Sequence, residues 1–193
     1  MNIIIDFLNM IVEFIQNSGT FGVIISVCFI FVESILPVLP LSVFITINFM
    51  VLGPLIGFII SWIFTVLGCI MSYTIFRKGL GNKFDNLTSN KKLLNKYKHL
   101  FKNISTTKLL LIIAMPFTPA FVVNIVCGLI KMDFKKYFIA LLFGKIAMVY
   151  FWGFVGTSLV ESINNPIILL KIVLIMSITY LLYVILRKVL KFE

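Results

Sequence analysis

Residues 33–40 read ESILPVLP, and their two prolines, Pro37 and Pro40, interrupt a long apolar segment. Proline lacks a backbone N–H and fixes φ, so two prolines three residues apart end a helix. The segment is thereby divided into two apolar legs, residues 20–36 and 41–52, each of which is marginal in length for crossing a bilayer. This pattern predicts two short helices joined by a proline turn.

A second apolar segment, residues 109–130, is broken in the same way by Pro116 and Pro119 in the sequence PFTP. Lysines flank both ends of this segment, whereas no Lys or Arg precedes Arg77. Because cytoplasmic flanks of membrane segments are enriched in Lys and Arg, the two broken segments are expected to enter the membrane from opposite sides. We therefore predict two opposed re-entrant helical hairpins, over residues 20–52 and 109–130.

Composition makes a bilayer the expected solvent. Of the 193 residues, 61% are hydrophobic and only 12% are charged, whereas about a quarter of a soluble domain is charged. The net charge of +10 also suits nucleic-acid binding, but nine of the 17 Lys and Arg residues fall between Arg77 and Lys108, beside apolar segments. That placement is typical of a cytoplasmic loop and argues against nucleic acid as a partner. The abundance of Ile, Lys, Asn and Phe suggests an AT-rich bacterium as the source. We therefore expect an all-α polytopic protein of a bacterial cytoplasmic membrane.

Three uninterrupted apolar runs are predicted to cross the bilayer as long helices, at residues 55–76, 137–160 and 167–186. The first ends in the basic loop at residues 77–108, and the last is followed by Arg187 and Lys188. This loop and the C-terminus are therefore predicted to be cytoplasmic. The expected fold is three long transmembrane helices plus two opposed re-entrant hairpins with Pro-x-x-Pro turns.

Two amphipathic segments are expected to lie on the membrane surface. Residues 1–18 separate polar and apolar positions at helical spacing and carry acids rather than lysines, which predicts an interfacial helix. Within the basic loop, residues 90–102 mix lysines with leucines and aromatics, a pattern that favours an anionic inner leaflet as partner. The expected divisions are the interfacial helix (1–18), a membrane domain (19–160) and a C-terminal transmembrane helix (161–193).

The two hairpins resemble each other beyond their prolines. An asparagine follows each turn, Asn48 in the first half and Asn124 in the second, and the second turn contains Thr118. Broken helices expose backbone polar groups, which a bilayer tolerates only where protein or a watery cavity satisfies them. Paired broken helices point to a transport site near the midplane, so these three side chains are expected to line a substrate or ion pathway. The alternative is two ordinary proline-kinked spans.

Two ionisable residues, Glu33 and Lys145, fall inside apolar segments. Burying either one alone would cost at least ~2.5–3.5 kcal/mol, so such residues usually face a cavity or a partner. We expect both to line one polar chamber between the hairpin tips, with Glu33 carrying a proton and Lys145 attracting an anionic head group. The alternatives are a hydrated tip for Glu33, and snorkelling or a structural ion pair for Lys145. Lys171 lies nearer the end of its span and is expected to snorkel.

Nothing in the sequence predicts an enzyme, a metal site or a cofactor. His99 lies in the basic loop without a catalytic partner, and seven acids scattered along the chain form no metal-binding motif. Cys28, Cys69 and Cys127 lie far apart in apolar stretches, where they are expected to be small buried hydrophobic residues.

These residues resemble those of a known family, the DedA superfamily, also called VTT or SNARE-associated Golgi proteins. The first half of the resemblance consists of ESILPVLP at 33–40 followed by Gly53, Gly57, Gly68, Tyr73, Arg77 and Gly79. The second half consists of PFTP at 116–119 followed by Asn124, Gly128, Phe134, Tyr137, Gly144 and Gly156. The resemblance is distributed over residues 19–160 rather than concentrated in one motif.

The resemblance implies two opposed re-entrant helices and a role in handling lipids. Bacterial members are implicated in returning undecaprenyl phosphate or other phospholipids across the cytoplasmic membrane, coupled to ion gradients. Eukaryotic relatives behave as lipid scramblases. Glu33 matches the acid of the family's first hairpin. Many members carry a second acid where this chain has Leu41 and Ser42, and an arginine where it has Ile113. Lys145 is a candidate to replace that arginine, though without its bidentate geometry.

The expected function is therefore a DedA-like lipid transporter or scramblase that moves undecaprenyl phosphate or another phospholipid, coupled to a proton or sodium gradient. A non-transporting membrane scaffold is the first alternative, and an exporter of ions or small solutes is the second. A scaffold needs no wet chamber, so cysteines placed near Glu33 and Lys145 would resist polar thiol reagents.

Overall fold

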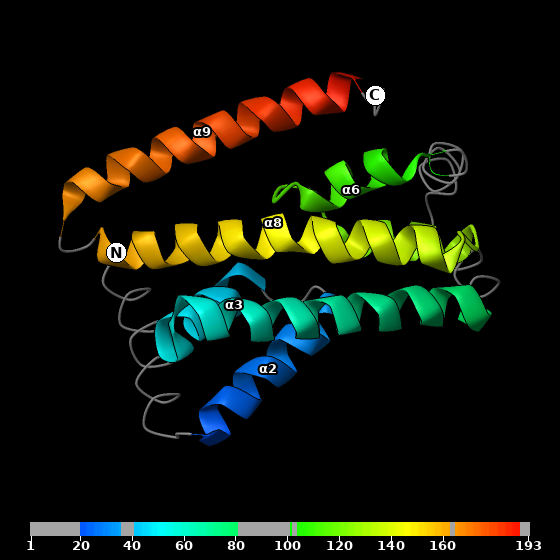
Figure 1. The fold of residues 1–193 in the computed structure, drawn as a ribbon, viewed down its shortest axis with the longest axis horizontal. Helices are drawn as coiled ribbons and strands as arrows, with labels where there is room; N and C mark the ends of the chain where they lie inside the picture. The colour runs from blue at the N-terminus through cyan, green and yellow to red at the C-terminus, as the bar shows by residue number, and fades with distance from the viewer. Residues whose placement is uncertain (1–19, 36–40, 81–100, 102–103, 163–164, 190–193) are drawn as a thin grey trace.

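The computed structural model describes residues 20–35, 41–80, 101, 104–162 and 165–189, and these are built from helices and short turns (Figure 1). The elements are α2 (Thr20–Ile35), α3 (Leu41–Ile75), a π-helix η1 (Phe76–Leu80), α6 (Thr106–Ala114), α7 (Ala120–Leu129), α8 (Phe134–Glu161) and α9 (Pro166–Val189). The expected interfacial helix at 1–18, the turn containing Pro37 and Pro40, His99 and most of the basic loop lie outside the described residues.

The long helix α3 reverses direction at Gly53. This glycine has φ 77° and ψ 165°, a backbone conformation that side chains with a Cβ rarely adopt, and Pro54 follows it. The Asn48 amide donates to the Ser61 hydroxyl at 3.1 Å, although thirteen residues of straight helix would separate them by about 20 Å. The two legs, residues 41–52 and 54–75, therefore fold back on each other, close to the predicted boundary between hairpin and span.

Helix α2 packs antiparallel against the first leg of α3. The Ser26 hydroxyl donates to the Asn48 side chain at 2.6 Å, and the rings of Phe29 and Phe44 stack with centroids 5.0 Å apart. Moving forward along α2 thus means moving backward along α3, as in a helical hairpin. Whether this pair is re-entrant in the membrane stays a prediction.

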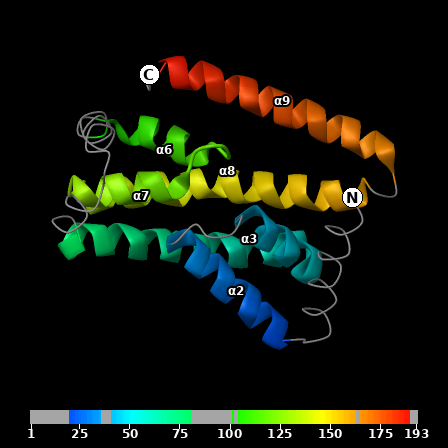
Figure 2. The ribbon, with the colours of Figure 1, turned by 180° about the vertical axis from the view of Figure 1, so that it is seen from behind.

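The second broken segment forms α6 and α7, with Pro116 and Pro119 in the turn between them. Helix α6 packs on α8 through Ile113 and Gly144, and α7 packs on α3 through Gly128 and the carbonyl of Tyr73. Figures 1 and 2 show α2 reaching the middle of the bundle from one end and α6 reaching it from the opposite end. The two helix pairs are thus opposed, while their depth in a bilayer stays a prediction.

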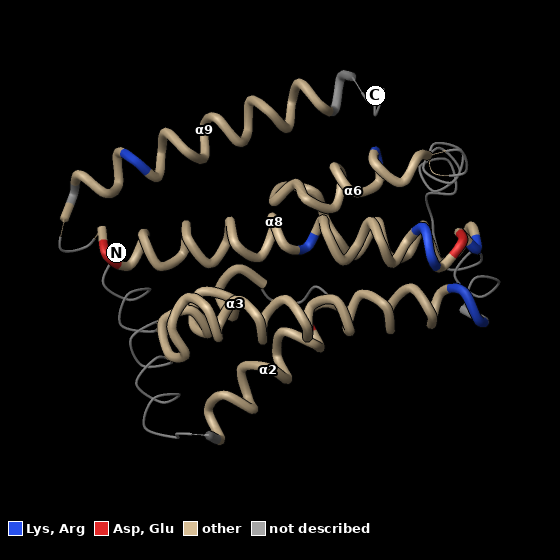
Figure 3. Tube along the Cα trace, viewed as in Figure 1, with Lys and Arg blue, Asp and Glu red and all other residues tan. Residues whose placement is uncertain are grey.

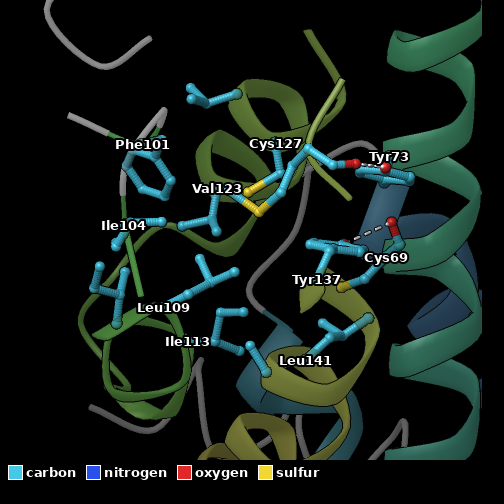
Figure 4. Packing of buried hydrophobic residues seen from close by; sticks show 14 of the residues in the cluster. Cys69, Tyr73, Phe101, Ile104, Leu109, Ile113, Val123, Cys127, Tyr137 and Leu141 are labelled. Carbon is cyan, nitrogen blue, oxygen red and sulfur yellow. Dashed lines mark hydrogen bonds between the residues drawn. The ribbon is translucent and has the colours of Figure 1, made fainter. Parts of the chain in front are cut away.

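The central pair of the bundle is α3 and α8, which run antiparallel. The Tyr137 hydroxyl lies 3.1 Å from the Cys69 carbonyl, and the Trp62 indole donates to the Leu142 carbonyl at 3.0 Å. Around them lies a core of buried aliphatic and aromatic side chains from α3, α6, α7 and α8 (Figure 4). A smaller core joins α2, the first leg of α3 and α8 through Ile30, Ile45, Phe49 and Val149.

Three described helices are long and apolar enough to cross a membrane: Leu41–Lys78 with its reversal, Phe134–Glu161 and Ile167–Leu186. Their outer faces are apolar and exposed, with Leu170 at 76% exposure as the extreme, which suits contact with lipid. Charged residues gather along the chain where α3 ends and α8 begins (Figure 3). We call this the basic end; it carries Arg77, Lys78, Lys131, Lys135 and Lys136.

Two of the three cysteines are buried, as predicted, but Cys28 is exposed on α2. The prediction for Cys28 was wrong because a uniformly apolar helix gives no indication of which side faces lipid. Lys171 is exposed near the start of α9, which agrees with its expected position at the edge of a span.

Candidate functional site

Lys145 is fully buried in the middle of α8. It lies eleven residues after Phe134, or about 17 Å along the helix, and its side chain is 0% exposed. Its ammonium lies 3.3 Å from the sulfur of Met148, a weak acceptor for a cation. Leu141 and Val149, one turn to either side, belong to the two apolar cores. The Lys145 side chain therefore lies on the buried face of α8, between the two apolar cores.

Glu33 is 9% exposed and lies near the end of α2, where that helix meets α3. Its neighbour Ser34 packs against Gly68, which lies so close to the Phe31 carbonyl that a methyl group there would collide with it. The acid thus lies beside a close contact of α2 with α3. A chamber shared by Glu33 and Lys145 stays a prediction.

Asn48 is 1% exposed and is bound at both ends of its amide. Its oxygen accepts from Ser26 of α2, and its nitrogen donates to Ser61 in the second leg of α3. Polar side chains bridge helices in this way inside membranes. The observed contacts make Asn48 a brace for the first hairpin; the expected role in a substrate pathway stays a prediction.

Asn124 is 1% exposed in α7 and is bound at one end only. Its oxygen lies 2.9 Å from the Tyr137 hydroxyl, while its amide nitrogen has no hydrogen-bond partner in the described chain. The same hydroxyl also lies 3.1 Å from the Cys69 carbonyl, so the phenol faces two acceptors. Neither contact involves the Asn124 nitrogen, which stays unpaired among the described residues.

Thr118, Pro116 and Pro119 form the turn that separates α6 from α7. The Thr118 N–H donates to the Met115 carbonyl at 3.2 Å, and Pro119 occupies the cap position of α7 without a side-chain hydrogen bond. Thr118 is half-buried, and its role in a pathway stays a prediction. Between the prolines, Phe117 contacts four aromatic rings, Phe151 and Trp152 of α8 and Tyr180 and Tyr183 of α9.

Small and polar residues also line one face of α3, a feature not singled out by the sequence analysis. They are Gly57, Ser61, Thr65, Gly68 and Ser72, all buried. Their spacing of four, four, three and four residues is the spacing of one helix face, so the sequence contained the signal. Thr65 and Ser72 hold hydroxyl oxygens with no hydrogen-bond partner in the described chain.

Ile113, where the resemblance implies an arginine in many family members, is 4% exposed and packs against Gly144. Gly144 directly precedes Lys145, so the cation on α8 is one residue away from the contact with Ile113 of α6. Because adjacent residues of a helix point about 100° apart, Lys145 does not point in the direction in which Gly144 contacts Ile113.

Comparison with known proteins shows which sequences this chain is similar to. The VTT domain matches residues 39–158. The chain is 30% identical over 172 residues to "Uncharacterized membrane protein YhjE" of Bacillus subtilis (strain 168), covering 89% of this chain and 82% of that protein. It is 25% identical over 148 residues to "Uncharacterized protein YqeD" of the same organism, covering 77% and 71%.

No solved structure matches the chain significantly. The VTT match covers more than half of the chain and includes both Lys145 and the proline turn of the second hairpin. The chain therefore belongs to the VTT domain family of membrane proteins, the DedA superfamily.

Proposed function

We propose that this protein moves a lipid with a phosphate-bearing head group across the bacterial cytoplasmic membrane, as a transporter or scramblase. The observation that carries the proposal is the complete burial of Lys145 halfway along α8, where its ammonium lies 3.3 Å from the Met148 thioether sulfur. A cation kept at this depth at a cost of several kcal/mol usually has a partner that is bound during function.

A lipid substrate accounts for both the exposed apolar faces of the helices and the buried ammonium. The exposed apolar faces of α3, α8 and α9 offer a surface for acyl or isoprenoid chains that remain in the bilayer. The polar head group is the part that needs a path through the protein, and an ammonium is an effective point charge for a phosphate. Family membership makes undecaprenyl phosphate the first candidate, with other phospholipids as the next.

Lys145 would take the place of the arginine that many family members carry where this chain has Ile113. The two positions are joined by the contact of Ile113 with Gly144. A lysine holds phosphate without the bidentate fork of arginine, so weaker discrimination between head groups is expected. Glu33, near the end of α2, would carry the coupling proton or bind the coupling sodium ion.

The test is lipid translocation in liposomes that contain the purified protein. Lys145→Met removes the charge at similar length, Lys145→Arg keeps it, and Lys171→Met removes an exposed lysine from another span. We expect Lys145→Met to lower translocation of a phosphate-bearing lipid by at least about tenfold, or ~1.4 kcal/mol, and Lys171→Met to leave it unchanged.

Full activity in Lys145→Met would refute the assigned role of the cation. Absence of lipid movement in a folded wild type would favour the two alternatives. A scaffold then predicts no solute flux, whereas an exporter predicts substrate-dependent currents.

A further inference from the structure

Hydroxyl groups on the described helices usually bond to their own backbone. Such bonds to the carbonyl four residues earlier are made by Ser34, Thr46, Thr74, Thr157 and Thr179. In an apolar solvent this is the simplest way to satisfy a hydroxyl. Thr65 and Ser72 of α3 differ: each is 0% exposed, and neither hydroxyl oxygen has a partner in the described chain.

The unpaired groups lie on one edge of α3, between the regions that two other helices cover. With 3.6 residues per turn, Ser72 points within about 20° of Thr65, and Gly68 about 60° to one side. Cys69 and Tyr73 point about 40° and 80° to the other side. Gly68 packs on α2, whereas Gly128 of α7 lies against the backbone carbonyl of Tyr73 and the Cβ of Phe76. The Tyr73 ring itself stacks on Tyr137 of α8. Thr65 and Ser72 therefore lie along the seam where α2, α3 and α7 meet.

The unpaired amide nitrogen of Asn124 belongs to the same seam. The Tyr137 hydroxyl lies 3.1 Å from the Cys69 carbonyl (Figure 4). The same hydroxyl lies 2.9 Å from the Asn124 oxygen, which places Asn124 beside Cys69. Cys69 is on the turn of α3 between Thr65 and Ser72. Three buried polar groups from two helices, none with a partner among the described residues, thus lie along one interface, which we call the polar seam: Thr65, Ser72 and Asn124.

The chemistry of these groups selects their ligand. An amide nitrogen only donates hydrogen bonds, and a hydroxyl donates or accepts. A bare cation would be repelled by the amide, whereas a phosphate oxygen accepts from all three groups. The seam leads from the basic end, where Arg77 is one turn beyond Tyr73, to the part of α3 that contacts α2 beside Glu33.

The geometry points to the polar seam as a second binding site, which holds the phosphate of the transported lipid between the basic end and Lys145. In the structure the seam is closed, and its unpaired groups make that state unfavourable. Separation of α7 from α3 would admit the head group, which would then satisfy all three groups. This inference rests on the proposed function and assigns to α7 the movement that opens the path.

The first test measures accessibility and does not depend on transport. In a chain with Cys28→Ala, Cys69→Ala and Cys127→Ala, single Thr65→Cys and Ser72→Cys variants in membrane vesicles are exposed to a charged methanethiosulfonate. Val66→Cys is the matched control, since Val66 is 6% exposed and belongs to the apolar core on the same helix. Labelling of positions 65 and 72, but not 66, is expected.

The same labelling identifies the ligand when phosphate compounds compete with the reagent. Dihexanoyl phosphatidic acid is expected to slow labelling, and dihexanoylglycerol, which lacks the phosphate, is expected to have no effect. Equal protection by inorganic phosphate would support the site but contradict a lipid source. Absence of labelling at 65 and 72, or labelling that no phosphate slows, would overturn the inference even if the wild type moves lipid.

A second test separates the seam from ordinary packing. Thr65→Val and Ser72→Ala remove unpaired hydroxyls, so both variants should be at least as stable as the wild type. Each should nevertheless lower lipid translocation by about tenfold, as expected for loss of one hydrogen bond to a charged group. Thr74→Val, whose hydroxyl bonds to the Ile70 carbonyl, is the control. Unchanged translocation in both seam variants would contradict the inference.

Discussion

Gly57 lies directly against the backbone carbonyl of Asn48, although nine residues of α3 separate the two along the sequence. Straight helix would place them about 13 Å apart. The contact exists because the chain reverses at Gly53, and it leaves no room for a side chain on Gly57.

Gly57→Ala is therefore expected to destabilise the first hairpin by about 1–3 kcal/mol, because the added methyl group would meet backbone atoms that cannot rotate away. Thermal unfolding of the detergent-solubilised protein measures the loss. Ile56→Ala, at a lipid-facing position with 55% exposure, is the neighbouring control. Equal stability of Gly57→Ala and the wild type would show that the two legs are not packed in this way.

Asn48→Leu should lower stability by about 1–2 kcal/mol, because it leaves the buried hydroxyls of Ser26 and Ser61 without their partner. A double-mutant cycle with Ser61→Ala measures the coupling. If Asn48 acts as the described brace, the two changes will be less than additive. Full additivity, with a loss of transport larger than the loss of folded protein, would instead favour the pathway role predicted from the sequence.

The turn between α7 and α8 is held by the end of α3. The Met132 carbonyl accepts from the Tyr73 hydroxyl at 2.5 Å and from the Arg77 guanidinium at 2.6 Å, and the preceding Lys131 has a φ of 52°. Tyr73→Phe should increase hydrogen exchange of this turn about fivefold, the effect of losing one hydrogen bond. Tyr150→Phe, at a ring with 61% exposure, is the control and should change nothing.

Phe117 couples the second turn to α9 through ring contacts with centroids 5.9 Å from Tyr180 and 6.2 Å from Tyr183. Phe117→Ala should weaken the docking of α9 by about 0.5–1.5 kcal/mol for each aromatic pair lost, beyond the loss of buried area. Fluorescence of Trp152, recorded with Trp62→Phe, should shift and lose anisotropy. Phe143→Ala, at a ring with 54% exposure on α8, should leave the signal unaltered.

Much of the helical framework could be predicted because it follows from local sequence. Apolar runs predict the three long helices, and prolines predict the break between α6 and α7. Glu33 and Lys145 could be singled out because they are ionisable residues within apolar segments, and the structure shows that both are buried. At Gly53 the sequence predicted only a boundary between the first hairpin and the following span. The chain reversal there could not be predicted, because it depends on the contact of Gly57 with Asn48.

The partners of the candidate site could not be predicted in the same way. The bond between Tyr137 and Asn124, and the aromatic contacts of Phe117, join helices whose relative rotation is set by tertiary packing. Thr65 and Ser72 were visible as part of a small and polar stripe on α3, but only the structure shows that their hydroxyls lack partners. The exposed position of Cys28 likewise depends on how α2 is covered.

The most direct test of the central claim measures undecaprenyl phosphate on the outer surface of bacteria depleted of their own recycling transporters. A probe that binds the lipid phosphate from outside is applied to cells that express the wild type, Lys145→Met or Lys171→Met at equal levels. The account predicts that the wild type and Lys171→Met clear the exposed lipid and that Lys145→Met does not. Exposed lipid that stays high with folded wild-type protein in the membrane would contradict undecaprenyl phosphate as the substrate. Clearance by Lys145→Met would contradict the role of the buried cation.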